Sequence, residues 1–190
     1  DGQAYFVGTE FKAGYKTWLF RLSADGTTLD LDSRILLNEG FGREANKLYK
    51  IKGTYYHLYS EHRPGVGRYL MMKRARRITG PYGEPRQLSE VQADIHEPNQ
   101  GGLVQAENGQ WYFLTHHGTG AWEGRPASLL PVTWIDKWPI IGKPNSRGIG
   151  EMVWHHAKPV VAKAPMVFPQ TPDSFDSGTL HPQWEWYYQP

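Results

Sequence analysis

The sequence contains no cysteine, which excludes disulfide bonds and thiolate metal sites. It also lacks long apolar runs, since no stretch approaches the roughly 20 consecutive apolar residues that a membrane-spanning helix needs. Helical periodicity is scarce along the whole chain. We therefore expect neither a membrane association nor a helical core. The missing cysteines do not decide between a cytoplasmic and a secreted protein, so the composition leaves localisation open.

An excess of charge of one sign is also lacking. Lys and Arg number 21 against 19 Asp and Glu, which gives a formal net charge of +2. Nucleic-acid binding usually requires a basic stripe or patch, so we expect no nucleic-acid partner. The single basic cluster, KRARR at 73–77, is interpreted as the solvated end of a strand rather than a phosphate site.

Short alternating aromatic runs, bounded by Gly, Asn, Asp and Pro, recur instead and predict an all-β protein. Three of them share one pattern, a tight turn that leads into an aromatic strand: DGQAYFV, IKGTYYHLY and ENGQWYFLT. Their glycines are Gly2, Gly53 and Gly109, which lie 51 and 56 residues apart. A second strand candidate follows each copy: KTWLFRLS, RYLMMKRA and ASLLPVTWI.

A repeat of this length with several short strands is typical of a β-propeller, whose four to eight blades are four-stranded sheets. The chain has room for about three blades, so we expect an incomplete ring. Open sheet edges pair readily with other strands, and we therefore expect homo-oligomerisation that covers them. The chain begins directly in a turn before a strand, which we interpret as a sign that it is a piece of a longer protein.

The composition divides the chain into three parts. Residues 1–142 contain the repeats and are predicted to form the partial propeller. Residues 143–172 are rich in proline and are predicted to be a linker that packs along the propeller. Residues 173–190 are predicted to begin a second β domain.

No phosphate-binding loop, zinc signature or nucleophile elbow is present in the sequence. The adjacent histidine pairs at 116–117 and 155–156 would point to opposite faces of a strand, so neither pair is expected to chelate a metal as a unit. Glu44, Glu97 and Glu123 fall in loops or at strand starts, where carboxylates can line a pocket. The many Trp and Tyr side chains would suit stacking against sugars or an ordinary β core.

Three segments resemble glycoside hydrolase family 43 in the expected order. EANKLYKIKGTYYHLY, from Glu44, is similar to the segment of that family that carries the general acid. NQGGLVQAENGQWYFLTHHG, from Asn99, is similar to the Gln-Gly-Gly segment that enters the last blade. GRPASLLPVTWIDKWPIIG, from Gly124, resembles the Gly-Arg pair followed by LxPVxWxDGWPxxG, with Lys137 in place of the usual Gly. The tail from Val167 resembles the start of the β-sandwich that follows the propeller in many members.

The resemblance implies a five-bladed propeller that hydrolyses pentose linkages of xylan, arabinoxylan or arabinan with inversion. It implies β-xylosidase, α-L-arabinofuranosidase or xylanase activity, with a hemicellulose or pentose oligosaccharide as partner. It places the general acid at Glu44 and a substrate-binding arginine at Arg125, with Trp122, Gln100 and His117 as further substrate-binding candidates. A polysaccharide substrate favours an extracellular or periplasmic location for the parent protein.

The resemblance also places two family carboxylates, the base Asp and the Asp that modulates the acid, before Asp1. We therefore expect hydrolysis by this chain to be impaired, and Glu97 and Glu123 are the first candidates for a substitute base. The alternative is a non-catalytic truncated propeller that binds hemicellulose or only self-assembles. Members of the family often hold a structural calcium near a histidine in the channel.

No cofactor is certain from these residues. Asn99 stands where the calcium-site histidine is expected, and His96, Gln100 and His117 are the weak substitutes for it.

Overall fold

The computed structural model describes residues 2–91, 98, 100–116, 125–162, 172–181, 183 and 184. The chain divides into two compact units, Asp1–Val160 and Val161–Pro190. Regular structure in the described ranges is β, apart from one 3₁₀ turn, η1 (Phe11–Ala13). No helix among these residues has the length and apolar character to cross a membrane. The all-β expectation is confirmed.

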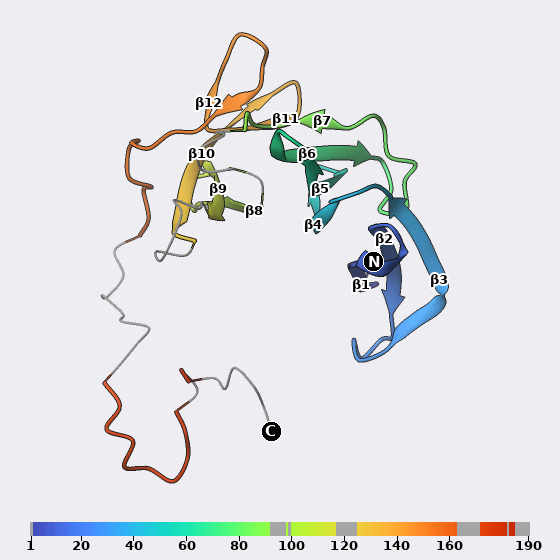
Figure 1. Ribbon diagram of the computed structural model, residues 1–190, viewed down its shortest axis with the longest axis vertical. Coiled ribbons are helices and arrows are strands. Elements are labelled where there is room, and N and C mark those ends of the chain that lie inside the picture. Colours follow the sequence, from blue (N-terminus) through green and yellow to red (C-terminus); the bar gives the residue numbers. More distant parts are fainter. Residues whose placement is uncertain are drawn as a thin grey trace. The chain divides into compact units, whose positions relative to one another are not determined.

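Three antiparallel sheets follow one another along the first unit (Figure 1). The first blade comprises β1 (Tyr5–Glu10), β2 (Lys16–Leu22) and β3 (Leu29–Asn38). The second comprises β4 (Glu44–Ile51), β5 (Thr54–Arg63), β6 (Gly67–Ala75) and β7 (Arg86–Gln87). The third comprises β8 (Gly101–Gln105), β9 (Trp111–His116), β10 (Ala127–Ile135) and β11 (Trp138–Ile141).

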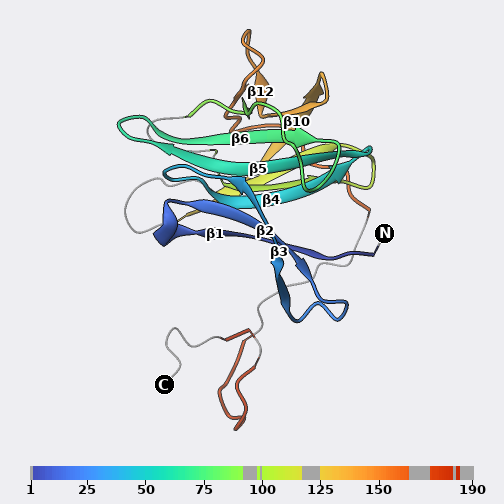
Figure 2. The ribbon, with the colours of Figure 1, turned by 90° about the vertical axis from the view of Figure 1, so that its right-hand side faces the viewer.

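The repeat predicted from the sequence forms one recurring hairpin. The three aromatic segments overlap β1, β5 and β9, and the segments expected after them overlap β2, β6 and β10. Each pair is antiparallel. The long strands of the second blade run alongside one another in Figure 2. Successive antiparallel sheets of this kind are propeller blades, and the three described here are fewer than the four to eight of a closed propeller.

Two blade hairpins close with the two-residue turn that sheet twist favours. In both turns each central residue has a positive φ: Lys52 at 47° and Gly53 at 79°, and Asp136 at 51° and Lys137 at 63°. Two positive φ values define the type I′ turn, whose twist matches that of the flanking strands. Glycine adopts this backbone without strain, whereas Lys137 does not.

The second and third blades share an apolar core. Its fully or almost fully buried members are Tyr56, Leu58, Leu70, Met72, Leu88, Phe113, Leu130, Trp138, Ile140 and Ile141. Two tyrosines, Tyr56 in this core and Tyr49 packed against it, also bond across the seam: Tyr56 Oη donates to the Lys137 carbonyl at 2.9 Å, and Tyr49 Oη accepts from the Leu103 amide at 2.9 Å. Apolar burial and these bonds fix the two blades against each other.

The first and second blades are joined by polar contacts instead. Asn46 donates through Nδ2 to Thr9 Oγ1 at 2.6 Å and accepts through Oδ1 from His57 Nε2, also at 2.6 Å. Lys73 Nζ donates to the Leu37 carbonyl at 3.1 Å and to Asn38 Oδ1 at 3.0 Å. The interpretation of 73–77 as a solvated strand end is therefore wrong for Lys73, because β6 continues to Ala75 and carries the ammonium into this seam.

The residues after the third blade return to the second blade. A short sheet pairs β12 (Lys143–Pro144) with β13 (Gly150–Glu151), and the Glu90 amide donates to the Gly150 carbonyl at 2.6 Å. A Cβ on Gly150 would lie 1.7 Å from the Ile141 carbonyl oxygen, so only glycine permits this approach. Part of the predicted linker thus packs on the blades, while the predicted domain boundaries at 142 and 172 stay predictions.

The second unit is described at 161, 162, 172–181, 183 and 184, and no strand occurs in those residues. Its described contacts are local. Asp173 accepts hydrogen bonds from the Phe175 amide at 3.0 Å and from Trp184 Nε1 at 2.7 Å. The predicted start of a β-sandwich at 173–190 stays a prediction.

Candidate active site

Glu44 is the first residue of β4, and the strand bulges directly after it. Glu44 pairs with Ser60 and Lys47 with Leu58, so two residues of β4 face one residue of β5. Ala45 in this bulge has a φ of 56°, a left-handed backbone that costs about 1 to 2 kcal/mol for a residue with a Cβ. A bulge bends its strand and turns side chains to a new direction. The bulge therefore sets the direction of the Glu44 carboxylate.

Two side chains hold the Glu44 carboxylate, whose side chain is 18% exposed. Arg68, near the start of β6, forms an ion pair with it through Nη1. Gln100, directly before β8, donates from Nε2 to Glu44 Oε1 at 3.1 Å. The structure thus brings together Glu44 and Gln100, which the sequence named as acid and substrate-binding candidates. Their predicted roles stay predictions.

Sequence reasoning missed Arg68. The segment that contains it was predicted only as a strand, and its role as a partner of Glu44 depends on register. In the β5–β6 hairpin Arg68 pairs with His62, two residues beyond Ser60, which itself pairs with Glu44. That register follows from the turn at 64–66, which the sequence analysis did not assign.

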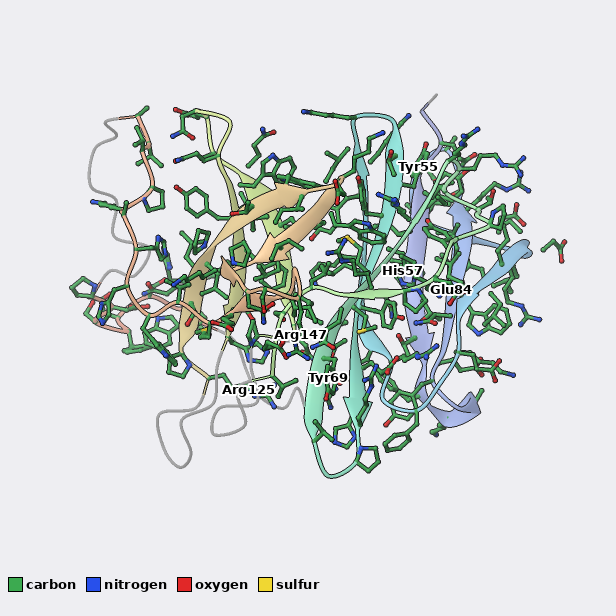
Figure 3. The ribbon with its side chains drawn as sticks, turned by 90° about the horizontal axis from the view of Figure 1, so that it is seen from above. Tyr55, His57, Tyr69, Glu84, Arg125 and Arg147 are labelled. Atoms are coloured by element: carbon green, nitrogen blue, oxygen red, sulfur yellow. The ribbon has the colours of Figure 1, made fainter. Side chains whose placement is uncertain are left out.

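Arg125 lies at the same end of the blades as Glu44. Arg125 stands two residues before Ala127, which pairs with His116 at the end of β9. Thr115, the neighbour of His116, pairs with Gly101, and Gly101 directly follows Gln100, the partner of Glu44. Figure 3 shows Arg125 toward the end marked by Tyr69 and away from Tyr55. Arg125 is exposed, as a side chain that contacts a substrate must be.

The two other predicted substrate-binding residues, Trp122 and His117, lie outside the described residues. Glu97 and Glu123, the candidates for a substitute base, do as well.

The loop between β3 and β4 is fixed by Arg43, the neighbour of Glu44. The Arg43 guanidinium donates from Nε to Glu61 Oε2 at 2.9 Å and from Nη1 to Asn38 Oδ1 at 2.9 Å and the Glu39 carbonyl at 2.8 Å. Glu61 also accepts from Arg63 Nε at 2.8 Å. These charge-assisted bonds hold residues 39–43 against the end of β5 and so support the position of Glu44.

Metal-ligating side chains are scattered among the described residues. These residues contain no group of three or more His, Asp or Glu side chains placed to hold an ion. Gln100 is bonded to Glu44, while His96, Asn99 and His117 lie outside the described residues. His156 bonds to the carbonyls of Ala157 and Leu129 rather than acting with His155 as a chelating pair. The structural calcium that the resemblance suggests therefore stays a prediction.

The fold and the site together define a class of protein. It is a β-propeller whose antiparallel blades hold a partly buried carboxylate at one end of the sheets.

The family model for glycosyl hydrolases family 43 matches residues 1–139. A protein of Formosa agariphila named beta-xylosidase is 34% identical over 195 residues, which cover 93% of this chain and 33% of that protein. The chain belongs to glycosyl hydrolases family 43. It spans about a third of the length of the curated relatives it matches.

Solved structures agree with this assignment. A bifunctional GH43-CE protein of Bacteroides eggerthii is 32% identical with a TM-score of 0.65, and the match covers 79% of this chain and 19% of that one. The xylan beta-1,4-xylosidase of Bacillus halodurans is 24% identical with a TM-score of 0.71, over 95% of this chain and 38% of that one. At this identity the second match shows the fold alone, which is the β-propeller.

Proposed function

We propose that this chain carries the general-acid part of a glycoside hydrolase site for pentose linkages of xylan or arabinoxylan, with Glu44 as the acid. The carrying observation is the placement of Glu44: a partly buried carboxylate at a bulge, oriented by two side chains from different strands. Family membership and relatives named beta-xylosidase support the substrate class. They favour a β-xylosidase over an α-L-arabinofuranosidase or a xylanase.

The chemistry assigned to Glu44 is protonation of the leaving oxygen. In an inverting hydrolysis the bond from the anomeric carbon to this oxygen breaks as the oxygen takes a proton from the acid, while water attacks from the opposite face. A second carboxylate takes the proton of that water, about 6.5 to 9.5 Å from the first. In the acid role the Glu44 carboxyl carries a proton, and its carbonyl oxygen can still accept a hydrogen bond from Arg68.

Two further predicted residues, Gln100 and Arg125, have roles that their chemistry supports. Gln100 orients the carboxylate through its amide. Arg125 offers a planar set of donors to vicinal hydroxyls at the same end of the blades. The family base precedes Asp1 in the resemblance, so hydrolysis by this chain alone is proposed to be slow, by about 10² to 10⁴ for the lost base.

The test compares the chain with Glu44→Gln on two substrates. Nitrophenolate leaves with little protonation, whereas the sugar alkoxide released from xylobiose needs a proton. Loss of a general acid should therefore reduce the hydrolysis of xylobiose far more than that of nitrophenyl xyloside. Glu107→Gln, at an exposed turn, is the matched control and should behave as the wild type.

The alternative is a propeller that binds hemicellulose without catalysis. It would be favoured if the chain and Glu44→Gln are equally inert on xylobiose, nitrophenyl xyloside and nitrophenyl arabinofuranoside but are both retained on xylan. Size exclusion of the same samples tests the predicted self-association, which stays a prediction.

A further inference from the structure

Four rings meet at the Glu44 end of the first two blades. We call them the aromatic patch: Phe11, Tyr15, Phe41 and His62. Neighbouring ring centres lie 5.5 Å apart from Phe11 to Tyr15, 5.4 Å from Tyr15 to Phe41 and 5.7 Å from Phe41 to His62, with edge-to-face geometry. The contacts join the turn between β1 and β2 to the loop before β4 and to the end of β5.

The patch is open to solvent although its members are apolar or aromatic. Phe11 is 56% exposed and Phe41 is 62% exposed. Single exposed apolar side chains are ordinary, but a contiguous group of them marks a binding surface. The ring contacts show that these residues form one surface rather than isolated positions.

The backbone under the patch is fixed before any ligand arrives. Arg43 braces the loop that carries Phe41 through Glu61 and Asn38. The His62 amide donates to the Gly42 carbonyl at 3.2 Å, and a Cβ on Gly42 would lie 2.4 Å from the His62 Cβ. Gly42 thus permits a close approach that a larger residue would block. A surface held in this way loses little conformational entropy on binding.

The patch adjoins the candidate acid. Phe41 precedes Glu44 by three residues, and His62 pairs with Arg68, whose guanidinium contacts the Glu44 carboxylate. A general acid touches the oxygen that leaves with the departing sugar. The surface next to Glu44 is therefore where sugars on the leaving side of that bond would emerge.

We propose that the aromatic patch binds the leaving-group side of a pentose oligosaccharide, beyond the linkage that Glu44 protonates. This inference rests on the proposed function. Aromatic faces pack against the C–H faces of sugar rings, and an uncharged pentose chain needs no charged partner on the patch. A long oligosaccharide reaches the patch, whereas a disaccharide at the site uses little of it.

Titration calorimetry of the full chain with xylobiose and xylohexaose tests the proposal. All proteins carry Glu44→Gln, so that no ligand is hydrolysed during the titration. Phe41→Ala and Phe11→Ala should each weaken xylohexaose binding by about tenfold while changing xylobiose binding by less than about twofold, since truncation of a well-packed aromatic contact costs about that much. If Phe41→Ala does not fold, Phe41→Leu takes its place in the test. This variant keeps most of the apolar volume but removes the ring, and it should also weaken xylohexaose binding.

Phe6→Ala is the matched control, because Phe6 is an exposed phenylalanine on β1 outside the patch. It should leave both affinities unchanged. Equal xylohexaose affinity for the control and the patch variants would overturn the proposal, as would a failure of the parent to bind xylohexaose. A change in sedimentation of the patch variants without a change in saccharide affinity would overturn it as well, because the patch would then be a protein contact.

The two proposals fail separately. If Glu44→Gln does not reduce xylobiose hydrolysis selectively, Glu44 is not the acid, but patch-dependent binding of xylohexaose can still be observed. If Glu44-dependent hydrolysis is present and the patch variants bind normally, only the patch proposal is overturned.

Discussion

Gln100 donates a hydrogen bond to Glu44 and so links the third blade to the second, with 3.1 Å between Gln100 Nε2 and Glu44 Oε1. Glu44 begins the second blade, and Gln100 stands directly before the third. The direction of the candidate acid therefore depends on how these blades pack, through a contact between residues 56 positions apart in the chain.

Gln100→Ala should lower the hydrolysis of xylobiose without unfolding the protein. A hydrogen bond to a charged group contributes about 1.5 kcal/mol or more, so its loss should reduce kcat/KM by about tenfold. Gln105→Ala is the control, because Gln105 ends β8 and its side chain donates to the nearby Gly109 carbonyl. The prediction is checked by initial rates beside circular dichroism. Equal rates for both variants would show that Gln100 does not orient the acid.

Arg43→Met should lower the free energy of unfolding by about 2 kcal/mol, because it removes three hydrogen bonds, to the partly buried Glu61, to the buried Asn38 and to the Glu39 carbonyl. Methionine keeps most of the apolar stem, so the change tests the charge and the hydrogen bonds. Arg21→Met removes the exposed ion pair with Asp30 and should cost less than about 1 kcal/mol. Urea midpoints for the two variants provide the comparison. A midpoint for Arg43→Met that matches Arg21→Met would contradict the bracing role.

The blades could be predicted from the sequence because their signals are local. Each aromatic strand follows a turn with its own glycine, and strand alternation needs no knowledge of distant residues. Glu44 could be named for a similar reason, since its motif is contiguous. The pairing with Arg68 and the aromatic patch could not, because they depend on the bulge at Ala45, on hairpin register and on contacts between blades.

Lys73 is a residue for which the sequence-based expectation was wrong for the same reason. Its basic neighbours suggest a solvated segment, but its hydrogen bonds lie in the seam with the first blade. Which face of a strand meets another blade is a property of the assembled sheets. Composition around a single residue does not contain it.

Lys137→Gly should stabilise the protein by about 0.5 to 1 kcal/mol. Lys137 holds a φ of 63° in a type I′ turn, a backbone that favours glycine, although the larger unfolded-state entropy of glycine offsets part of the gain. Lys143→Gly, on β12 at an exposed position, should instead cost about 0.5 kcal/mol. Thermal unfolding of the two variants should therefore shift in opposite directions. A lower melting temperature for Lys137→Gly would mean that the Lys137 side chain stabilises the protein by more than the strain of its positive φ costs.

His57 should make the protein less stable as the pH falls below about 6.5. Burial, and secondarily the charge of Lys73, lowers the pKa of His57 to about 3 from its ordinary 6.5. Between these pH values the unfolded chain binds a proton that the folded chain does not. The free energy of unfolding therefore decreases as the pH is lowered, by about 2 kcal/mol from pH 7 to pH 5.

His57→Gln provides the comparison for this pH dependence. Asn46 Oδ1 can only accept, so His57 donates to it through Nε2, and a glutamine amide can donate in the same place. The variant should be less stable at pH 7 because its packing differs, yet it should lose less stability on going to pH 5, since glutamine does not titrate. Urea midpoints at the two pH values measure both slopes. Parallel slopes for the wild type and the variant would assign the pH dependence to other groups.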